Sequence, residues 1–95
     1  MTEESFMKAV ITVVGRDSVG IISRVSAECA AYNVNIHEIT QSVLSEYFVM
    51  IMIVDISDMT SSFDSFADKM AELGHSAKLE IRVMHEDIFN SMHEI

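Results

Sequence analysis

Apolar positions along the first third of the chain follow two different spacings. The segment Met7 to Val14 reads MKAVITVV, is rich in β-branched residues and ends at Gly15, which is typical of a β-strand. From Val19 to Tyr32, steps of three and four residues separate the apolar positions Ile21, Ile22, Val25, Cys29 and Tyr32. This spacing predicts an amphipathic helix. We expect Asp17 or Ser18 to cap its first turn, because a side-chain oxygen there can accept from free N–H groups.

The middle of the chain has the pattern of two strands joined by a hairpin. A second strand is expected to begin at Val34, and its alternation is imperfect over Ile36–Ile39, which indicates a β-bulge. The residues Leu44-Ser45-Glu46 form a polar-centred break that suits a hairpin turn. The run from Tyr47 to Asp55 reads YFVMIMIVD and is apolar at nearly every position. A strand that is apolar on both faces is expected at the centre of a sheet.

The last third of the chain predicts a helix, a strand and a short tail helix. Helical spacing relates the apolar residues Phe63, Phe66, Ala67, Met70 and Leu73. Gly74 follows where a left-handed C-cap residue would end this helix. Apolar and charged residues then alternate as in a strand with one buried face, the apolar positions being Ala77, Leu79, Ile81 and Val83. The segment 86–95 is expected to form an amphipathic tail helix.

These elements follow the order β-α-β-β-α-β, with the tail helix at the end. Two right-handed βαβ crossovers joined by a hairpin place both helices on one face of a four-stranded antiparallel sheet. The predicted strand order is 4-1-3-2. The fold class is therefore α+β and ferredoxin-like, in a single domain over residues 1–95 with a core at about 7–84 and a C-terminal tail at 85–95.

The uncovered face of this sheet is expected to be apolar where the third strand crosses it. One of two sets must point away from the helices: Phe48, Met50, Met52 and Val54, or Tyr47, Val49, Ile51 and Ile53. Val10 and Val14 would add to this surface. Contiguous apolar area on a small domain usually marks an interface. We therefore expect a homo-oligomer, a dimer or higher, while the alternative is that the tail folds back over this face.

Composition and charge restrict the partners of the chain. Asp and Glu number 15 against 6 Lys and Arg, a formal net charge of −9, which disfavours direct nucleic-acid binding. The single cysteine, Cys29, cannot form an intramolecular disulfide and favours a reducing compartment. The acidic start of the chain differs from a secretory signal, and no apolar run approaches membrane-spanning length. We expect a soluble, cytoplasmic protein without a membrane partner.

The loop Gly15-Arg-Asp-Ser-Val-Gly20 is the candidate for small-molecule chemistry. A strand-to-helix junction presents unpaired N–H groups and a positive helix end, which favour a carboxylate or phosphate; the alternative is a plain turn and cap. Ile21-Ile22 stand where a P-loop needs Lys and Ser or Thr, so nucleotide hydrolysis is not supported. The four histidines lack metal-ligand spacing, and Cys29 lies on the apolar helix stripe. We expect no catalysis, no metal and no cofactor.

Two segments resemble the pattern of the ACT domain family. One is Gly15-Arg-Asp-Ser-Val-Gly-Ile-Ile-Ser-Arg-Val-Ser26, and the other is Ala31-Tyr-Asn-Val-Asn-Ile36. The element order agrees from about Met7 to Met84. The segments Asn35-Ile-His-Glu-Ile-Thr-Gln-Ser-Val43 and Tyr47-Phe-Val-Met50 most resemble small stand-alone ACT proteins of bacteria. The glycine-cleavage-system transcriptional repressor is more distantly similar.

The resemblance implies a regulatory domain that pairs with copies of itself. It implies an amino acid bound between subunits, contacted by the first loop and the start of the second strand. Position by position it nominates Asp17, Ser18, Val19 and Gly20 from one chain, with Asn35 and Ile36 from a neighbouring chain. Backbone N–H groups near Val19 and Gly20 would hold a carboxylate, and the Asn35 amide would bind the amino or carboxylate group. Gln41 is a further candidate.

Three functions stay open from the sequence. The first is a regulatory module that binds a small molecule, an amino acid by our expectation, and signals to a separate, unidentified protein. The second is a ligand-free interaction or assembly module that acts on a metabolic enzyme or transcription regulator. The third is a small ferredoxin-like enzyme or metal carrier. It lacks support, because the residues around Arg16 do not match an acylphosphatase-like site and no CxxC occurs in the first loop.

Overall fold

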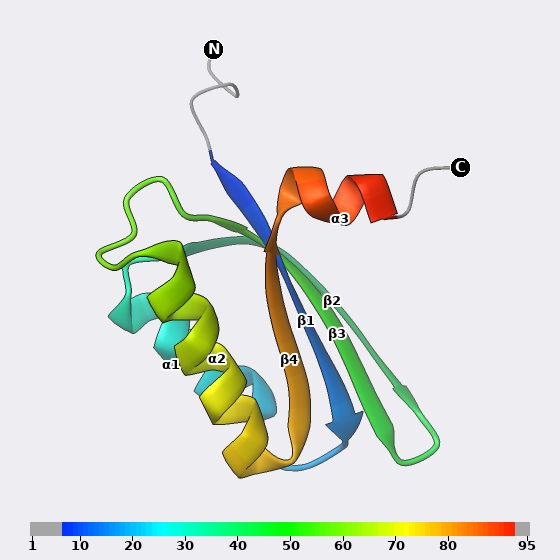
Figure 1. The fold of residues 1–95 in the computed structure, drawn as a ribbon. Helices are drawn as coiled ribbons and strands as arrows, with labels where there is room; N and C mark the ends of the chain where they lie inside the picture. Colours follow the sequence, from blue (N-terminus) through cyan, green and yellow to red (C-terminus); the bar gives the residue numbers. More distant parts are fainter. Residues whose placement is uncertain (1–6, 93–95) are drawn as a thin grey trace.

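The computed structural model describes residues 7–92, which fold in the predicted order. The elements are β1 (Lys8–Arg16), α1 (Ile21–Ala31), β2 (Asn35–Leu44), β3 (Tyr47–Asp55), α2 (Phe63–Ala77), β4 (Leu79–His85) and α3 (Glu86–Met92). The four strands form one antiparallel sheet in the order β2-β3-β1-β4, as predicted. Figure 1 shows α1 and α2 on one face of this sheet and α3 on the other.

The strand register agrees with the pattern in the sequence. In the β2–β3 hairpin, Leu44 pairs with Tyr47 across the turn at Ser45 and Glu46, and Asn35 pairs with Asp55 at the far end. The register shifts between Ile36 and Glu38, which confirms the predicted bulge. The strand β3 lies inside the sheet between β2 and β1, as its apolar composition predicted.

The core lies between the sheet and the helices α1 and α2. On β3 the set Phe48, Met50, Met52 and Val54 faces this core and is almost completely buried. The helices contribute buried residues at the predicted spacing: Val25, Cys29, Phe66 and Met70. The rings of Tyr32 and Phe66 meet edge to face at 5.5 Å between centroids, a favourable aromatic geometry that ties α1 to α2.

The start of α1 differs from the prediction. Its N-cap is Gly20, in the left-handed region at φ 87°, so the expectation that Asp17 or Ser18 caps the helix was wrong. The loop continues two residues further than the apolar spacing indicated, and the helix begins at Ile21 instead of Val19. A left-handed conformation favours glycine because it has no Cβ. The turn therefore required the glycine, and Asp17 and Ser18 remained in the loop.

The end of α2 also differs from the prediction. The helix runs to Ala77, past Gly74, and Lys78 is the left-handed C-cap residue at φ 61°. Ala77, predicted in the last strand, belongs to the helix. Gly74 is buried against β4, and a Cβ there would lie 2.6 Å from the Leu79 carbonyl oxygen. Close packing against β4, and not helix termination, thus accounts for glycine at this position.

The second face of the sheet carries the other apolar set of β3, as predicted for one of the two sets. From the register, Val10 and Val14 of β1 share this face with Val49 and Ile51 of β3. The helix α3 packs on β1 and β4, and Val10 is completely buried while Ile51 is 38% and Val14 44% exposed. The tail therefore covers one end of this face and leaves the other end open. The predicted continuation of the tail helix to Ile95 lies outside the described residues.

Candidate functional site

A cavity of 490 Å³ lies at the junction between β1 and α1. The loop and the first turn of α1 form one wall, and the hairpin end of β2 and β3 forms the other. Its lining residues are Asp17, Ser18, Gly20, Ile21, Ile22, Ser23, Gln41, Val43 and Phe48. We call it the loop cavity. It combines an apolar floor with a polar rim, the usual composition of a small-ligand site.

The first turn of α1 gives the loop cavity its electrostatic character. The first N–H groups of any helix have no acceptor inside the helix, and the N-cap here is Gly20, which has no side chain to accept from them. The Ser23 hydroxyl donates to the Gly20 carbonyl oxygen at 3.2 Å. The partial positive charge of the helix N-terminus therefore stays available at the cavity, where it favours a carboxylate or another small anion.

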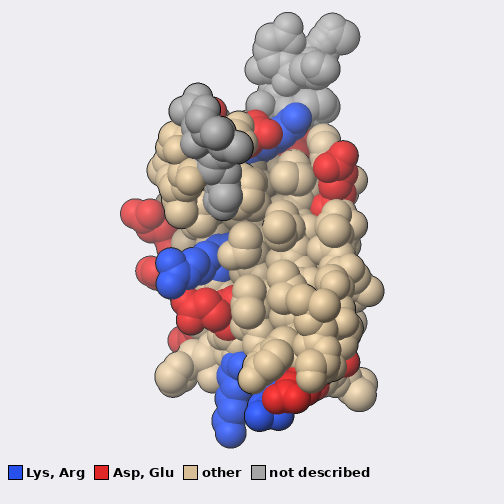
Figure 2. Space-filling view, turned by 90° about the vertical axis from the view of Figure 1, so that its right-hand side faces the viewer, with Lys and Arg blue, Asp and Glu red and all other residues tan. Residues whose placement is uncertain are grey.

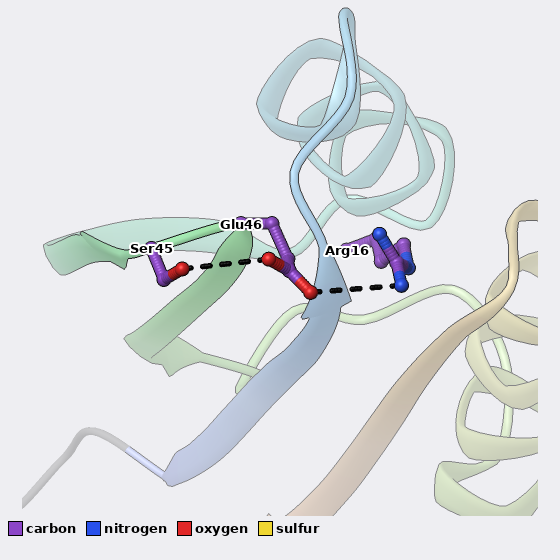
Figure 3. Close-up of polar contacts among 3 residues, drawn as sticks. All are labelled: Arg16, Ser45 and Glu46. Carbon is purple, nitrogen blue, oxygen red and sulfur yellow. Dashed lines mark hydrogen bonds and ion pairs between the residues drawn. The ribbon is translucent and has the colours of Figure 1, made fainter.

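The hairpin between β2 and β3 holds the loop in place. The Asp17 backbone N–H donates to the Glu46 carbonyl oxygen at 2.9 Å. Figure 3 shows the Glu46 carboxylate between Arg16, at 3.6 Å, and the Ser45 hydroxyl, which donates to it at 3.4 Å. The ion pair is exposed and contributes little stability by itself. Together with the backbone bond, it orients the loop relative to the cavity wall formed by β2 and β3.

The remaining nominated residues lie at the other end of the sheet. Asn35 pairs with Asp55, nine positions along β2 from the hairpin end at Leu44, a separation of about 30 Å at the rise of a strand. Asn35 lines a second cavity of 470 Å³ with Ala30, Asn33, Val34, Asp55 and Asp58, which we call the acidic cavity. Ile36 is half-buried and packs against the core. One chain therefore does not bring the two halves together.

The acidic cavity carries negative charge at neutral pH. The Ser57 side chain donates a hydrogen bond that lowers the pKa of Asp55, with further contributions from the Ser57 backbone N–H and from His37. The Ser57 N–H to Asp55 Oδ1 distance is 2.9 Å. The Asn33 amide donates to the Asp58 carbonyl oxygen at 3.0 Å and fixes the turn beside it. This cavity therefore favours a cationic group, whereas the helix N-terminus in the loop cavity favours an anionic one.

The structure brings together part of the set nominated from the sequence. Asp17, Ser18 and Gly20 line the loop cavity with Gln41, whereas the side chain of Val19 is 99% exposed at the loop tip. The first turn of α1 and the pair Val43 and Phe48 were not nominated. Val43 is paired with Phe48 in the hairpin register, so counting back in twos from the turn would have placed Gln41 and Val43 on the helix side.

Within residues 7–92, the structure gives no support for a metal site or for Cys29 as a nucleophile. In this part of the chain, no group of three or more His, Cys, Asp and Glu side chains could hold a metal ion. Cys29 is completely buried, and burial, helped by the charge of Glu28, raises the pKa of its thiol to about 11. A neutral buried thiol is a poor nucleophile. No helix over the same residues is long and apolar enough to cross a membrane.

Known structures define the class of the fold. An ACT domain protein from Streptococcus pneumoniae superposes with a TM-score of 0.77 at 38% identity, over 88% of this chain and 94% of that one. A formyltetrahydrofolate deformylase from Pseudomonas syringae pv. tomato superposes with a TM-score of 0.77 at 20% identity, over 84% of this chain but only 28% of that one. The second likeness shows the fold alone, as one part of a larger protein.

The sequence comparisons then identify the family. Residues 8–84 match the model of the ACT domain, and the chain belongs to the ACT domain family, whose members are regulatory modules. A UPF0237 protein of Clostridium perfringens is 51% identical over 89 residues, 94% of this chain and 100% of that protein. A UPF0237 protein of Methanosarcina acetivorans is 39% identical over the full length of both chains.

Proposed function

We propose that this protein is a regulatory module that binds an amino acid between two of its own chains and signals to a separate protein. The observation that carries the proposal is the loop cavity, which is built around the free N-terminus of α1 and lined by Asp17, Ser18 and Gly20. Membership of the ACT domain family supports a regulatory role over a catalytic one. The proposal assigns Asn35 and Ile36 to the same site, from the partner chain.

The position of β2 at the edge of the sheet supports a site shared between chains. This strand is an edge of the sheet and is exposed along almost its whole length. An exposed edge is a template for pairing with another strand. If two copies pair antiparallel along β2 about a two-fold axis, the Asn35 end of one strand lies beside the Leu44 end of the other. The loop cavity of one chain then lies next to the acidic cavity of its partner.

The charges of the two cavities fit the two ends of an amino acid. The helix N-terminus and loop N–H groups favour the carboxylate. Asp55 and Asp58 of the acidic cavity, with the Asn35 amide, favour the ammonium group. Phe48 and Val43 would contact an apolar side chain. In this arrangement each chain supplies the charge that its partner's half lacks, so the complete site exists only in the dimer.

The first test is a thermal-shift scan of the purified protein against the twenty amino acids. A ligand at a hundredfold excess over its Kd stabilises the folded state by about 2.7 kcal/mol, which raises the Tm of a domain this small by several degrees. One selective shift is the expected result. The variants Ser23→Glu, which places a carboxylate at the helix N-terminus in the loop cavity, and Asn35→Ala should lose it while remaining folded, and Ala27→Ser, on the exposed side of α1, should keep it. Undiminished shifts in both site variants would exclude this site.

A mixing experiment tests whether the site is shared. Neither Ser23→Glu nor Asn35→Ala homodimers should bind, because each lacks one half of both sites. After equal mixing and re-equilibration, about half of the dimers are mixed and each holds one intact site, so about one quarter of all sites should recover. Calorimetry gives this stoichiometry directly. If subunits exchange but no binding is recovered, both substituted residues belong to a site within one chain.

A ligand-free interaction module is the second candidate function. The open apolar end of the sheet face favours it, because Ile51 and Val14 remain exposed beside α3. A flat scan at millimolar amino acid would favour this function over the first. Affinity capture with the protein should then retain a metabolic enzyme or transcription regulator, and Ile51→Arg should abolish the capture.

A further inference from the structure

We infer that a second copy of the chain covers the open sheet face, with the α3 helix of each copy packed on the uncovered half of the other. This interface is separate from the β2 edge that the proposed function uses. It rests on three observations: how α3 divides the face, what the uncovered half exposes, and how charge is distributed around it.

The helix α3 divides the open face into a covered end and an uncovered end. At the covered end, the register places Val10 beside Ile53 and Met84, and Val10 is completely buried. At the uncovered end, exposed apolar residues of three elements meet: Val14, Leu44, Tyr47 and Ile51. A groove of 310 Å³ lies between the covered and the uncovered end, beside α3. It is lined by Thr12, Val14, Val49, Met50, Ile51, Arg82, Met84, Phe89 and Met92.

The helix α3 itself supplies the matching apolar surface. Its residues Ile88 and Met92 are 52% and 63% exposed although they flank the half-buried Phe89. A two-fold axis lying across the strands would place α3 of one copy over the uncovered end of the other. The two α3 helices would then lie next to each other between the two sheets, and each would fill the groove of the other copy. Both copies would use the same surface, which contains the groove and α3. Such an interface is isologous and closes as a dimer.

The distribution of charge on the open face favours contact with a second copy of the chain. Figure 2 looks onto the open face and shows a broad area without charged side chains, with acidic and basic residues at its margins. Arg82 pairs with Glu80 at 3.0 Å on one margin, and Arg16 pairs with Glu46 at 3.6 Å on another. In a chain with a net charge of −9, this neutral surface is where two copies can approach with little repulsion. A basic partner would instead be attracted to the acidic remainder of the molecule.

The dimensions of the face agree with a stable contact. Four adjacent strands of seven to ten residues give a face of roughly 25–30 Å by 15–20 Å. When the surface of the protruding side chains and of α3 is added, the area of this face approaches that of a standard interface, about 800 Å² per partner. The uncovered end alone would be small for a tight complex, so reciprocal burial of α3 is part of the inference.

Light scattering with matched variants tests this interface. The wild type should have a defined assembly mass at micromolar concentration, and Ile51→Arg on the sheet and Ile88→Asp on α3 should each halve it while preserving the circular dichroism spectrum. Ala27→Arg, on the exposed side of α1, should leave the mass unchanged. A monomeric wild type, or an unchanged mass in both interface variants, would overturn the inference and leave the face to another protein or to a small apolar ligand.

The same variants separate this inference from the proposed function. If both interfaces exist, Ile51→Arg reduces four chains to two and keeps the amino-acid thermal shift. If the β2-edge dimer does not exist, Ile51→Arg reduces two chains to one, and the open-face inference stands without the ligand site. If only the β2-edge dimer exists, Ile51→Arg changes neither mass nor ligand shift, and the open-face inference fails.

Cysteine cross-linking tests the predicted contact directly. Chains with Ile88→Cys should form disulfides with chains carrying Tyr47→Cys when the two are mixed and oxidised. The buried Cys29 supplies little background because its thiol is protected in the folded state. The expected product runs at twice the chain mass of 10.7 kDa. A control pair with Ala27→Cys in place of Ile88→Cys should not cross-link, and equal cross-linking of both pairs would contradict the arrangement.

Discussion

Gly74 lies where α2 approaches β4 most closely. A Cβ at this position would meet the Leu79 carbonyl oxygen at 2.6 Å and the Ile81 Cγ1 at 3.0 Å. Alanine is the better helix former by about 1 kcal/mol, so an isolated helix would gain from the change. In the folded chain, we expect Gly74→Ala to lower the free energy of unfolding by about 2 kcal/mol, because backbone atoms of β4 would have to move.

Urea unfolding followed by circular dichroism measures this difference. Asp68→Ala, on the exposed side of the same helix, is the control and should change the free energy of unfolding by less than about 0.5 kcal/mol. A Gly74→Ala variant as stable as the wild type would show that β4 and α2 can separate at this point without cost.

Cys29 is expected to be chemically silent in the folded protein. Its side chain is completely buried, and burial raises its pKa to about 11. At pH 8 a thiol reagent such as DTNB should react at least about 100-fold more slowly than with the unfolded chain, since reaction requires opening of the structure. Rapid labelling without denaturant would contradict the buried position.

The same raised pKa predicts a loss of stability in alkaline solution. The unfolded thiol ionises above its ordinary pKa of 9.0, whereas the folded thiol stays neutral until about 11. Between these values the unfolded state binds fewer protons, so the free energy of unfolding falls as pH rises. Cys29→Ala should lose this contribution, and the stability difference between wild type and variant should shrink from pH 8 to pH 10.5. A constant difference would argue against the raised pKa.

At the residue scale, the sequence rules failed where a tertiary contact decided the choice. Asp17 and Ser18 have good capping side chains, yet the left-handed turn at φ 87° needed Gly20 as N-cap. Gly74 has the local pattern of a C-cap, yet it is glycine because β4 packs against it. Local rules weigh a residue against its neighbours in sequence, and in both cases the deciding atoms belong to the path of the backbone or to another element.

Among the elements, α2 begins with a side-chain N-cap, Ser62. The Ser62 hydroxyl accepts from the Ser65 backbone N–H at 3.1 Å, and Asp64 lies in the first turn. Ser62→Ala should lower the free energy of unfolding by about 1 kcal/mol because it removes this cap. Ser65→Ala keeps the backbone donor and is the matched control. Equal stability of the two variants in urea unfolding would show that solvent replaces the cap.

The strands were more predictable than the helix ends. Alternation placed the bulge near Ile36, and the composition of β3 placed it inside the sheet. These features depend on burial over many residues, so one misassigned position does not change them. The ends of α1 and α2 each depend on one residue's backbone conformation. The split of the open face by α3 was also left undecided, because periodicity shows that a helix is amphipathic and not where it docks.

For the whole molecule, the sequence could nominate two sets of candidate site residues but could not show whether they meet. Asp17, Ser18 and Gly20 line one cavity, and Asn35 lines another at the far end of β2. Family resemblance proposed that they meet across chains, and no pattern within one chain could supply that contact. The fold adds a physical argument for a contact between chains: the helix N-terminus of one cavity and the carboxylates of the other lie at opposite ends of an exposed edge strand.

A ligand bound between chains must be linked to assembly, and this gives the last prediction. If an amino acid contacts the loop cavity of one chain and Asn35 of its partner, it binds the dimer more tightly than the monomer. By reciprocity, saturating ligand then strengthens dimerisation by the same factor for each of the two sites, a factor of roughly 5- to 150-fold for typical coupling energies. Sedimentation velocity across a dilution series, with and without the amino acid found in the scan, measures the shift in the dimer Kd. Asn35→Ala should remove the shift while retaining a wild-type dimer Kd without ligand. A ligand that raises the Tm but leaves the dimer Kd unchanged would bind within one chain, and Asn35 would then have no part in the site.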